Sequence, residues 1–137
     1  MHSKRKGNIG QFGIGLELSK LGYSVFTEEG DISKIDIIAE KDGALIRIQS
    51  KAITPVNDTI ELILVKAGPN YKFKYESNNF DYFGVWDLED HKAYLISADI
   101  LNKHNKSLKL RKTPAKNNQQ KNTHMLSDYA IEKILSS

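Results

Sequence analysis

Two strand-like runs joined by a turn signal constrain the fold of this chain more than any other feature. Residues 34–52 read KIDIIAEKDGALIRIQSKA, and Lys41-Asp42-Gly43 separates the two apolar runs. Asp-Gly between runs of β-forming residues is typical of a β-hairpin. The sequence therefore predicts antiparallel strands at residues 35–40 and 44–52.

The alternation of side chains in the second strand places two polar residues on one face. Ile46 and Ile48 share one face, and Gln49 and Lys51 share the other, because side chains in a strand point alternately to opposite sides. The hairpin brings Asp36, near the start of the first strand, opposite the end that carries Gln49 and Lys51. An acid, an amide and an amine can therefore converge at one point of the sheet.

These three groups are the ones that phosphodiester hydrolysis requires. A carboxylate such as Asp36 holds Mg²⁺, and a second oxygen ligand such as Gln49 fixes the position of the ion. A cation such as Lys51 orients the attacking water and shields the charge that develops on the phosphate. The alternative is a surface hairpin whose polar ends are solvated, because such short motifs also occur by accident.

The rest of the chain is predicted to form a helix followed by a meander of strands. Gly22 ends the expected helix at residues 7–21. Further strands are expected at residues 23–27, 60–66, 71–75, 82–87 and 92–97, with a helical turn at 99–102. A C-terminal helix at about 125–136 is expected to be capped by Ser127.

The expected first helix has two apolar faces on nearly opposite sides. At about 100° per residue, one stripe contains Ile9, Phe12 and Leu16, and the other contains Ile14, Leu18 and Leu21. One face can pack on the sheet. The other requires a second helix or a second subunit.

Composition limits the chain to one domain and narrows the kinds of site it can form. A chain of 137 residues with 39% hydrophobic residues can bury one core, so residues 1–137 are expected to form a single domain. Without cysteine it forms neither disulfides nor thiolate metal sites, and its four histidines lack zinc-ligand spacing. Any metal is expected to be held by oxygen. No apolar run is long enough for a bilayer, so we expect a cytoplasmic protein without a membrane partner.

A basic segment at residues 102–123 is the first candidate for binding DNA. It carries seven lysine and arginine residues and no acid, although the net charge of the chain is only +3. The side chains expected to contact phosphates or to read adenine are Lys109, Arg111, Lys112, Lys116, Asn117, Asn118, Gln119 and Gln120. The alternative for such a polar segment is a solvated, disordered loop.

A second candidate for binding DNA is the predicted strand at residues 71–75. Its alternation of aromatic and basic residues would turn the rings inward and offer Lys72 and Lys74 to DNA. The alternative is an edge strand that its lysines protect from pairing with another chain.

The order of these features resembles the PD-(D/E)xK nuclease superfamily. A glycine-rich helix, the strand GYSVF, the loop TEEGDISK and the hairpin follow the core of that family over about residues 4–100. Ile35-Asp36 stands in place of Pro-Asp, and Gln49-Ser50-Lys51 in place of (D/E)xK. The QxK variant and the later segment FDYFGVWDLEDHKAYLIS are most similar to the intron-encoded homing endonucleases. The resemblance implies an α/β restriction-endonuclease-like core with a central mixed β-sheet flanked by helices.

The resemblance also implies an activity, a cofactor and partners. It implies a site-specific endonuclease that hydrolyses double-stranded DNA with Mg²⁺ or Mn²⁺, with Ca²⁺ as a non-productive substitute. A homodimer or homotetramer would cut both strands. The implied catalytic residues are Asp36, Gln49, Lys51 and Gln11, and the implied metal ligands are Asp36, Gln49, Gln11 and the main-chain carbonyl of Ser50.

One residue departs from the pattern of the family. Many members carry a glutamate early in the helix, in a pattern like KGxxGE, and the segment KGNIGQ places Gln11 there. The implied site then has one carboxylate, so its affinity for metal should be weak. Glu17 and Glu29 are imperfect substitutes by their positions. A Holliday-junction resolvase on the same fold and a DNA-binding module with weakened or lost catalysis therefore remain alternatives.

Overall fold

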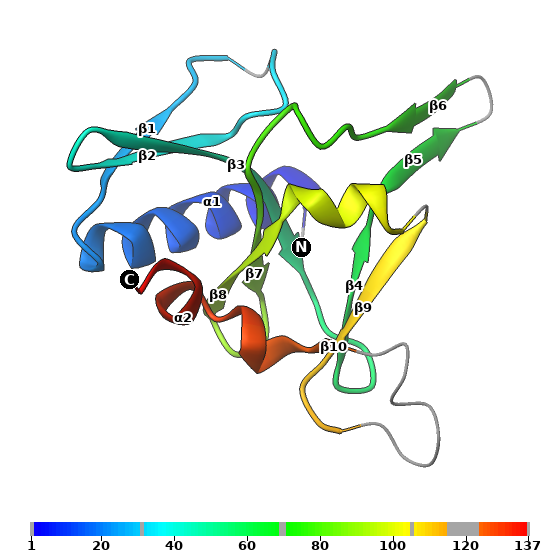
Figure 1. Cartoon of the computed structure of the whole chain (residues 1–137). Coiled ribbons are helices and arrows are strands. Elements are labelled where there is room, and N and C mark those ends of the chain that lie inside the picture. Colours follow the sequence, from blue (N-terminus) through cyan, green and yellow to red (C-terminus); the bar gives the residue numbers. More distant parts are fainter. Residues whose placement is uncertain (1, 31, 69–70, 105, 115–123, 137) are drawn as a thin grey trace.

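The computed structural model of the protein describes residues 2–30, 32–68, 71–104, 106–114 and 124–136, with the main chain alone at residues 66–68 and 71–74. The elements follow in the order α1 (Ser3–Lys20), β1 (Ser24–Thr27), β2 (Ile37–Lys41), β3 (Ala44–Ile53), β4 (Thr59–Ile63), β5 (Val65–Gly68), β6 (Tyr71–Lys74), β7 (Tyr82–Asp87), β8 (Lys92–Ser97), η1 (Ala98–Asn102), β9 (Ser107–Arg111), β10 (His124–Met125), η3 (Leu126–Tyr129) and α2 (Ile131–Leu135). Figure 1 shows their arrangement.

A mixed five-stranded sheet forms the centre of the fold, in the order β1-β2-β3-β7-β8. The predicted hairpin is present, because β2 and β3 pair antiparallel with Lys41 opposite Ala44. The prediction of a meander is wrong after β3, because β3 pairs with β7 in parallel. The chain leaves the sheet at the end of β3, forms β4, β5 and β6 outside it, and returns as β7. The α/β fold class with a mixed central sheet is confirmed.

A smaller sheet, in the order β10-β9-β4, lies outside the central one. The expected strand at residues 60–66 is divided between β4 and β5, and Leu64 between them donates its N–H to the carbonyl of Lys106 at 2.9 Å. No strand was predicted within the basic segment at residues 102–123, but residues 107–111 form one. They form β9, since Leu108 and Leu110 alternate with polar residues and both are buried.

Strands β5 and β6 pair antiparallel as a separate two-stranded ribbon, with Gly68 opposite Tyr71. The ribbon extends away from the body of the molecule (Figure 1). The two-stranded ribbon proposed for this segment is therefore present. The side chains of Lys72 and Lys74 lie outside those that the structure describes.

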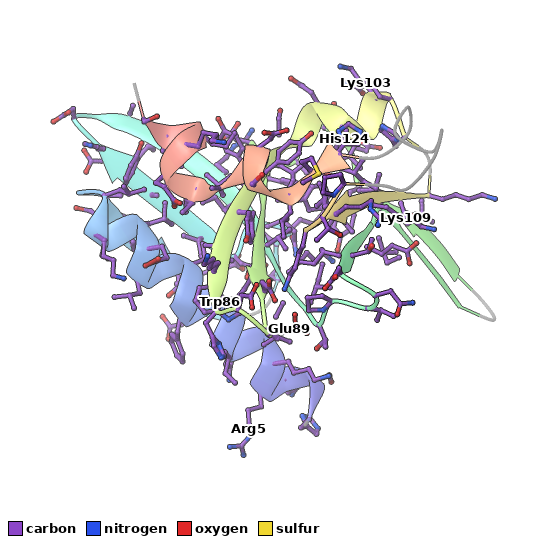
Figure 2. All side chains as sticks on the ribbon, turned by 90° about the horizontal axis from the view of Figure 1, so that it is seen from below. Arg5, Trp86, Glu89, Lys103, Lys109 and His124 are labelled. Carbon is purple, nitrogen blue, oxygen red and sulfur yellow. The ribbon has the colours of Figure 1, made fainter. Side chains whose placement is uncertain are left out.

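Helix α1 packs unusually close to the sheet because two of its glycines face it. A Cβ atom at Gly13 would lie 2.6 Å from the ring of Trp86, and one at Gly10 would lie 2.8 Å from the Cβ atom of Ala52. Figure 2 shows Trp86 against this helix. The glycines that lower the helix propensity of this segment are thus the ones that permit the contact. The helix also begins earlier than predicted, since Nδ1 of His2 accepts a hydrogen bond from the N–H of Lys4 at 3.2 Å.

The central sheet separates two apolar cores. On one side α1 contributes Ile14 and Leu18, both fully buried, as the second apolar stripe predicted. On the other side, strands β4 and β9 cover the sheet with a core that includes Leu62, Leu110 and Tyr75. Strands β7 and β8 supply residues to both cores and therefore lie between them (Figure 1).

The C-terminal segment differs from the single capped helix that the sequence predicted. It forms η3 and then the short helix α2, and the chain is extended at Ala130 between them. Ser127 is not the residue that caps α2, and the N-cap of each element lacks a side-chain hydrogen bond. Ala130 forms an isolated β-bridge with Tyr94 of β8, which interrupts the helix at this point. None of the described helices is both long and apolar enough to cross a bilayer.

Candidate active site

Asp36 lies at the point where β2 and β3 separate. Its N–H donates to the carbonyl of Ile48 at 2.9 Å, and β2 continues the pairing from Ile37 onward. Two residues further along β3, the N–H of Ser50 donates to Oδ2 of Asp36 at 2.8 Å. The carboxylate thus takes the place of a main-chain acceptor, which fixes its orientation beside β3.

Gln49 contacts the same carboxylate, as the hairpin register predicted. Its Nε2 atom donates to Oδ2 of Asp36 at 3.1 Å. The other amide atom, Oε1 of Gln49, is buried and has no hydrogen-bond partner in the part of the chain that the structure describes. A buried oxygen without a donor is costly unless a ligand or an ordered water satisfies it.

Lys51 is held by a buried tyrosine. Its Nζ atom donates to the hydroxyl of Tyr75 at 2.5 Å and lies 4.6 Å from the centroid of that ring. Tyr75 is only 3% exposed and packs edge-on against Phe80 and Phe83. Burial raises the pKa of Tyr75, and the negative charge of Asp36 raises it further. Asp36, Lys51 and Tyr75 therefore form one electrostatic group.

The role of Tyr75 was missed in the sequence. Its alternation with the lysines of the ribbon predicted an inward-facing ring, which is correct, but gave no indication of its contact with Lys51. The predicted inward direction of the Tyr75 ring was the only feature of the sequence that could have indicated this role.

Gln11 reaches Asp36 from α1, the helix from which the family resemblance implied its contribution. Its Nε2 atom donates to the main-chain carbonyl of Asp36 at 3.4 Å, a long hydrogen bond. The amide thus contacts the main chain at Asp36 from helix α1. Whether Gln11 also binds a metal stays a prediction.

A cleft of about 470 Å³ opens between the first turns of α1 and the loop that leads into β2. It is lined by Lys4, Gly7, Asn8, Gln11, Glu28, Gly30, Ser33, Ile35, Asp36 and Ser50. Lys4, Asn8 and Gln11 share one face of α1, since residues three and four apart lie side by side on a helix. The sequence analysis did not select Lys4, Asn8 or Glu28, although the basic run SKRK was visible at the start of the chain.

Glu28 is fixed in this cleft by its own loop. Its Oε1 atom accepts from the N–H groups of Ile32 and Ser33, each at 3.2 Å, and its Oε2 atom accepts from the hydroxyl of Ser33. The hydrogen bond from the Ser33 side chain is the main reason that the pKa of Glu28 is lowered. The two acids that the sequence offered as substitutes do not line the cleft. Glu17 pairs with Lys20 at 2.9 Å on α1, and Glu29 is absent from the lining residues.

The oxygen atoms at this site suit a hard divalent cation. Asp36, Ser50 and Gln11 line the cleft, and the buried amide oxygen of Gln49, whose amide bonds to Asp36, has no partner among the residues that the structure describes. Mg²⁺ and Ca²⁺ prefer such oxygen ligands. Among the described residues, no group of three or more His, Cys, Asp or Glu side chains is placed to hold a metal. A cation here would therefore depend on amide and main-chain oxygens beside its carboxylates.

The residues predicted to contact DNA occupy different environments. Lys109 is exposed on β9, and Arg111 of the same strand is half-buried, with its Nε atom bonded to the carbonyl of Thr113 at 3.0 Å. Both line a second cavity of about 560 Å³ beside β4. Figure 2 labels Lys109, the middle residue of β9. Lys116, Asn117, Asn118, Gln119 and Gln120 lie outside the described residues.

Lys112 is engaged in an ion cluster and does not face solvent as the sequence analysis expected. Its Nζ atom lies 2.9 Å from Asp87, 2.8 Å from Glu89 and 2.9 Å from Asp90, and its side chain is only 14% exposed. Burial opposes its charge, but the hydrogen bonds to these acids outweigh that effect and raise the pKa of Lys112. The cluster joins the end of β9 to the turn between β7 and β8.

Comparisons with known proteins agree with the fold of this chain. The model of the PD-(D/E)XK endonuclease family matches residues 1–132. A solved structure titled as a bacterial homing endonuclease, I-Ssp6803I, has the same fold, with a TM-score of 0.78 and 19% identity over 95% of this chain and 89% of that one. No curated protein is similar enough in sequence to count as a relative. The chain belongs to the PD-(D/E)XK endonuclease family.

Proposed function

We propose that this protein is a divalent-metal-dependent, site-specific endonuclease of the homing type that cuts double-stranded DNA as a homo-oligomer. The single observation that carries the proposal is the constellation of Asp36, Gln49 and Lys51 at the point where β2 and β3 separate. The likeness to a bacterial homing endonuclease along nearly the whole chain supports the homing type.

Each residue has a distinct role in this proposal. A bound Mg²⁺ or Mn²⁺ would supply Lewis-acid stabilisation of the phosphate. Asp36 and the amide oxygen of Gln49 hold the cation, with Ca²⁺ as a substitute that binds without supporting cleavage. Lys51 shields the charge that develops at the scissile phosphate and orients the water. Tyr75 keeps the ammonium group in place, so little reorganisation is needed during the reaction.

The DNA backbone would enter by the cleft beside α1. Lys4 lines that cleft and can contact a phosphate near the one that is cut. Arg5 extends outward from the start of the helix (Figure 2). The projecting β5–β6 ribbon and Lys109 of β9 offer further contacts at a distance from the site (Figure 1).

The homo-oligomer supplies a second active site for the second strand. Phe12 and Leu16 of α1 are 75% and 57% exposed on the single chain, so the apolar stripe that the sequence predicted as a possible interface is available. Exposed aromatic and aliphatic side chains at helical spacing suit contact with another copy.

Cleavage assays test the proposal. The protein with Mg²⁺ or Mn²⁺ is expected to cut a genomic-fragment library of duplex DNA at a small number of sites. Lys51→Ala should lower the single-turnover rate by about 10²–10³ while the affinity for DNA in Ca²⁺ changes little, because one oriented electrostatic group contributes about 2.7–4 kcal/mol to the barrier. Asp36→Asn should abolish cleavage through loss of the metal.

The same assay separates the rival functions. Preferential cutting of four-way junctions with little sequence preference would identify a Holliday-junction resolvase and refute the homing type. Tight binding of DNA without cleavage in any divalent metal would refute the nuclease and leave a DNA-binding module.

A further inference from the structure

We propose that Glu28 supplies a second carboxylate to the metal site and so replaces the acid that Gln11 does not provide. This inference deepens the proposed function and depends on it. The family pattern places its acid at position 11 on the helix, whereas in this structure a carboxylate from the loop after β1, that of Glu28, lines the same cleft as Gln11.

The charge of the site is the reason that a second acid is needed. Gln11 and Gln49 are neutral, so Asp36 is the only carboxylate among the residues of the predicted constellation. The affinity of an oxygen site for a divalent cation depends on the number of charged ligands. A site with Asp36 alone should hold Mg²⁺ weakly.

The cleft contains one other acid among its described lining residues, and that acid is Glu28. Asp36 and Ser50 line the side formed by β2 and β3, Gln11 lines the side formed by α1, and Glu28 comes from the loop after β1. A cation bound at Asp36 would therefore lie in the same cleft that Glu28 lines. Neither Glu17 nor Glu29 lines this cleft.

The loop holds the Glu28 carboxylate without using all of its oxygen lone pairs. Three donors from Ile32 and Ser33 fix its orientation, while a carboxylate offers about four acceptor sites. A fixed carboxylate loses little conformational freedom when it binds a cation. The buried Oε1 atom of Gln49 has no hydrogen-bond partner among the described residues, and the Nε2 atom of the same amide bonds to Asp36, so an acceptor oxygen is available for a ligand beside this carboxylate.

Metal binding in the absence of DNA tests the assignment without any measurement of activity. Titration calorimetry of the full chain with Mn²⁺, and separately with Ca²⁺, would compare the wild type with Glu28→Gln, Glu29→Gln and Asp36→Asn. Glu28→Gln should weaken binding at least about tenfold, because it removes the charge and retains an acceptor oxygen for the loop. Glu29→Gln removes the same charge from the neighbouring residue and should change the affinity less than about twofold.

Two further variants separate ligation from a purely structural role. Ser33→Ala removes the hydroxyl that bonds to Glu28 and keeps the carboxylate, so it should weaken Mn²⁺ binding far less than Glu28→Gln does. Gln11→Glu in the Glu28→Gln background should restore much of the affinity, because it returns a carboxylate to the same cleft from the helix. Thermal unfolding of each variant would verify that the fold is retained.

The outcomes distinguish this inference from the proposed function. If Asp36→Asn loses Mn²⁺ while Glu28→Gln binds it like the wild type, Glu28 is only a loop anchor and the inference is overturned, with the nuclease proposal intact. If equal losses follow Ser33→Ala and Glu28→Gln, the loop geometry matters and ligation by Glu28 is refuted. If no variant alters Mn²⁺ binding and the wild type does not cut DNA, both proposals fail.

Discussion

At the scale of single residues, the start of β2 determines the position of the Asp36 carboxylate. Asp36 stands just before β2 begins, and its carboxylate receives the N–H of Ser50, which β2 no longer reaches. Because the Asp36 side chain takes the place of a main-chain acceptor, a hydrogen bond of the sheet type fixes its orientation. The hydrogen bonds from Ser50 and Gln49 explain how this carboxylate keeps one orientation beside β3.

Another acid, Asp87, is fully buried and serves stability instead of chemistry. It pairs with Lys112 at 2.9 Å, and its Oδ1 atom accepts the N–H of Glu89 at 2.8 Å. Its neighbours explain why Lys112 should be classed with the fold and not with the DNA-binding surface. Lys112 directly follows β9, which packs beside this turn. Its positive charge is therefore neutralised by acids of the same chain.

The structure predicts opposite phenotypes for two lysines of the basic segment. Lys112→Met should lower the free energy of unfolding by about 3 kcal/mol, because it leaves a buried carboxylate without its cation. Lys109→Met, on an exposed side chain, should change stability by less than about 0.5 kcal/mol. Urea denaturation followed by tryptophan fluorescence would measure both.

The same two variants, Lys109→Met and Lys112→Met, should also differ in how their affinity for DNA depends on salt. Lys109→Met should flatten the slope of log affinity against log salt by about one if the side chain contacts a phosphate, and Lys112→Met should leave the slope unchanged. A Lys112→Met protein of normal stability with a flattened slope would show that the ion cluster opens to bind DNA.

At the scale of elements, helix α1 joins the core to the active site. Its second turn approaches β3 and β7 through Gly10 and Gly13, and the same part of the helix places Gln11 against Asp36. Since Gly13 lies against Trp86 and Gln11 is two residues away, a shift of the helix would move the amide that contacts the site. Packing and site geometry are therefore coupled in this helix.

Two glycine substitutions in α1 should have opposite effects on stability. Gly13→Ala should destabilise the protein by about 1–3 kcal/mol, because its Cβ atom would lie 2.6 Å from the Trp86 ring. Gly7→Ala meets nothing within 4 Å and should stabilise by about 0.5–1 kcal/mol, since alanine is the better helix former. Thermal unfolding monitored by circular dichroism would rank the three proteins. A Gly13→Ala protein as stable as Gly7→Ala would contradict the close packing of α1 on the sheet.

At the scale of the whole molecule, the apolar surface is unevenly distributed. Ile14 and Leu18 of α1 are buried on the sheet, whereas Phe12 and Leu16 on another side of the same helix remain exposed. The short helix α2 packs near β8 and contributes Ile131 to the core on this side of the sheet. The single chain thus buries one of the two apolar stripes that its first helix carries.

Polar replacements at the exposed residues Phe12 and Leu16 should disrupt the oligomer and leave the fold of the single chain intact. Phe12→Ser with Leu16→Ser is expected to lower the mass measured by light scattering after gel filtration and to convert double-strand breaks into nicks, because each subunit carries one site. Val56→Ser, at an exposed apolar side chain beyond β3, is the control and should alter neither result. An unchanged mass for the double variant would exclude this face as the interface.

Local patterns in the sequence were sufficient to predict most strands and the pair at the centre of the site. The Asp-Gly turn and the alternation of residues 44–52 determine that Asp36 and Gln49 meet, since both depend on neighbours within one hairpin. The buried stripe of α1 and the inward direction of Tyr75 follow from the same periodicity. The family resemblance, which combined these local features, predicted the α/β fold correctly.

Contacts between distant segments were decided only by the tertiary structure. Three features each join residues separated by long stretches of chain: the parallel pairing of β3 with β7, the Tyr75 hydroxyl on Lys51, and the cleft that Glu28 and Gln11 both line. Lys112 was misjudged for the same reason, because its partners lie on another hairpin. A hairpin is specified by turn chemistry and alternation among adjacent residues. Which loop faces a cleft depends instead on how the whole core packs, and no local pattern encodes that.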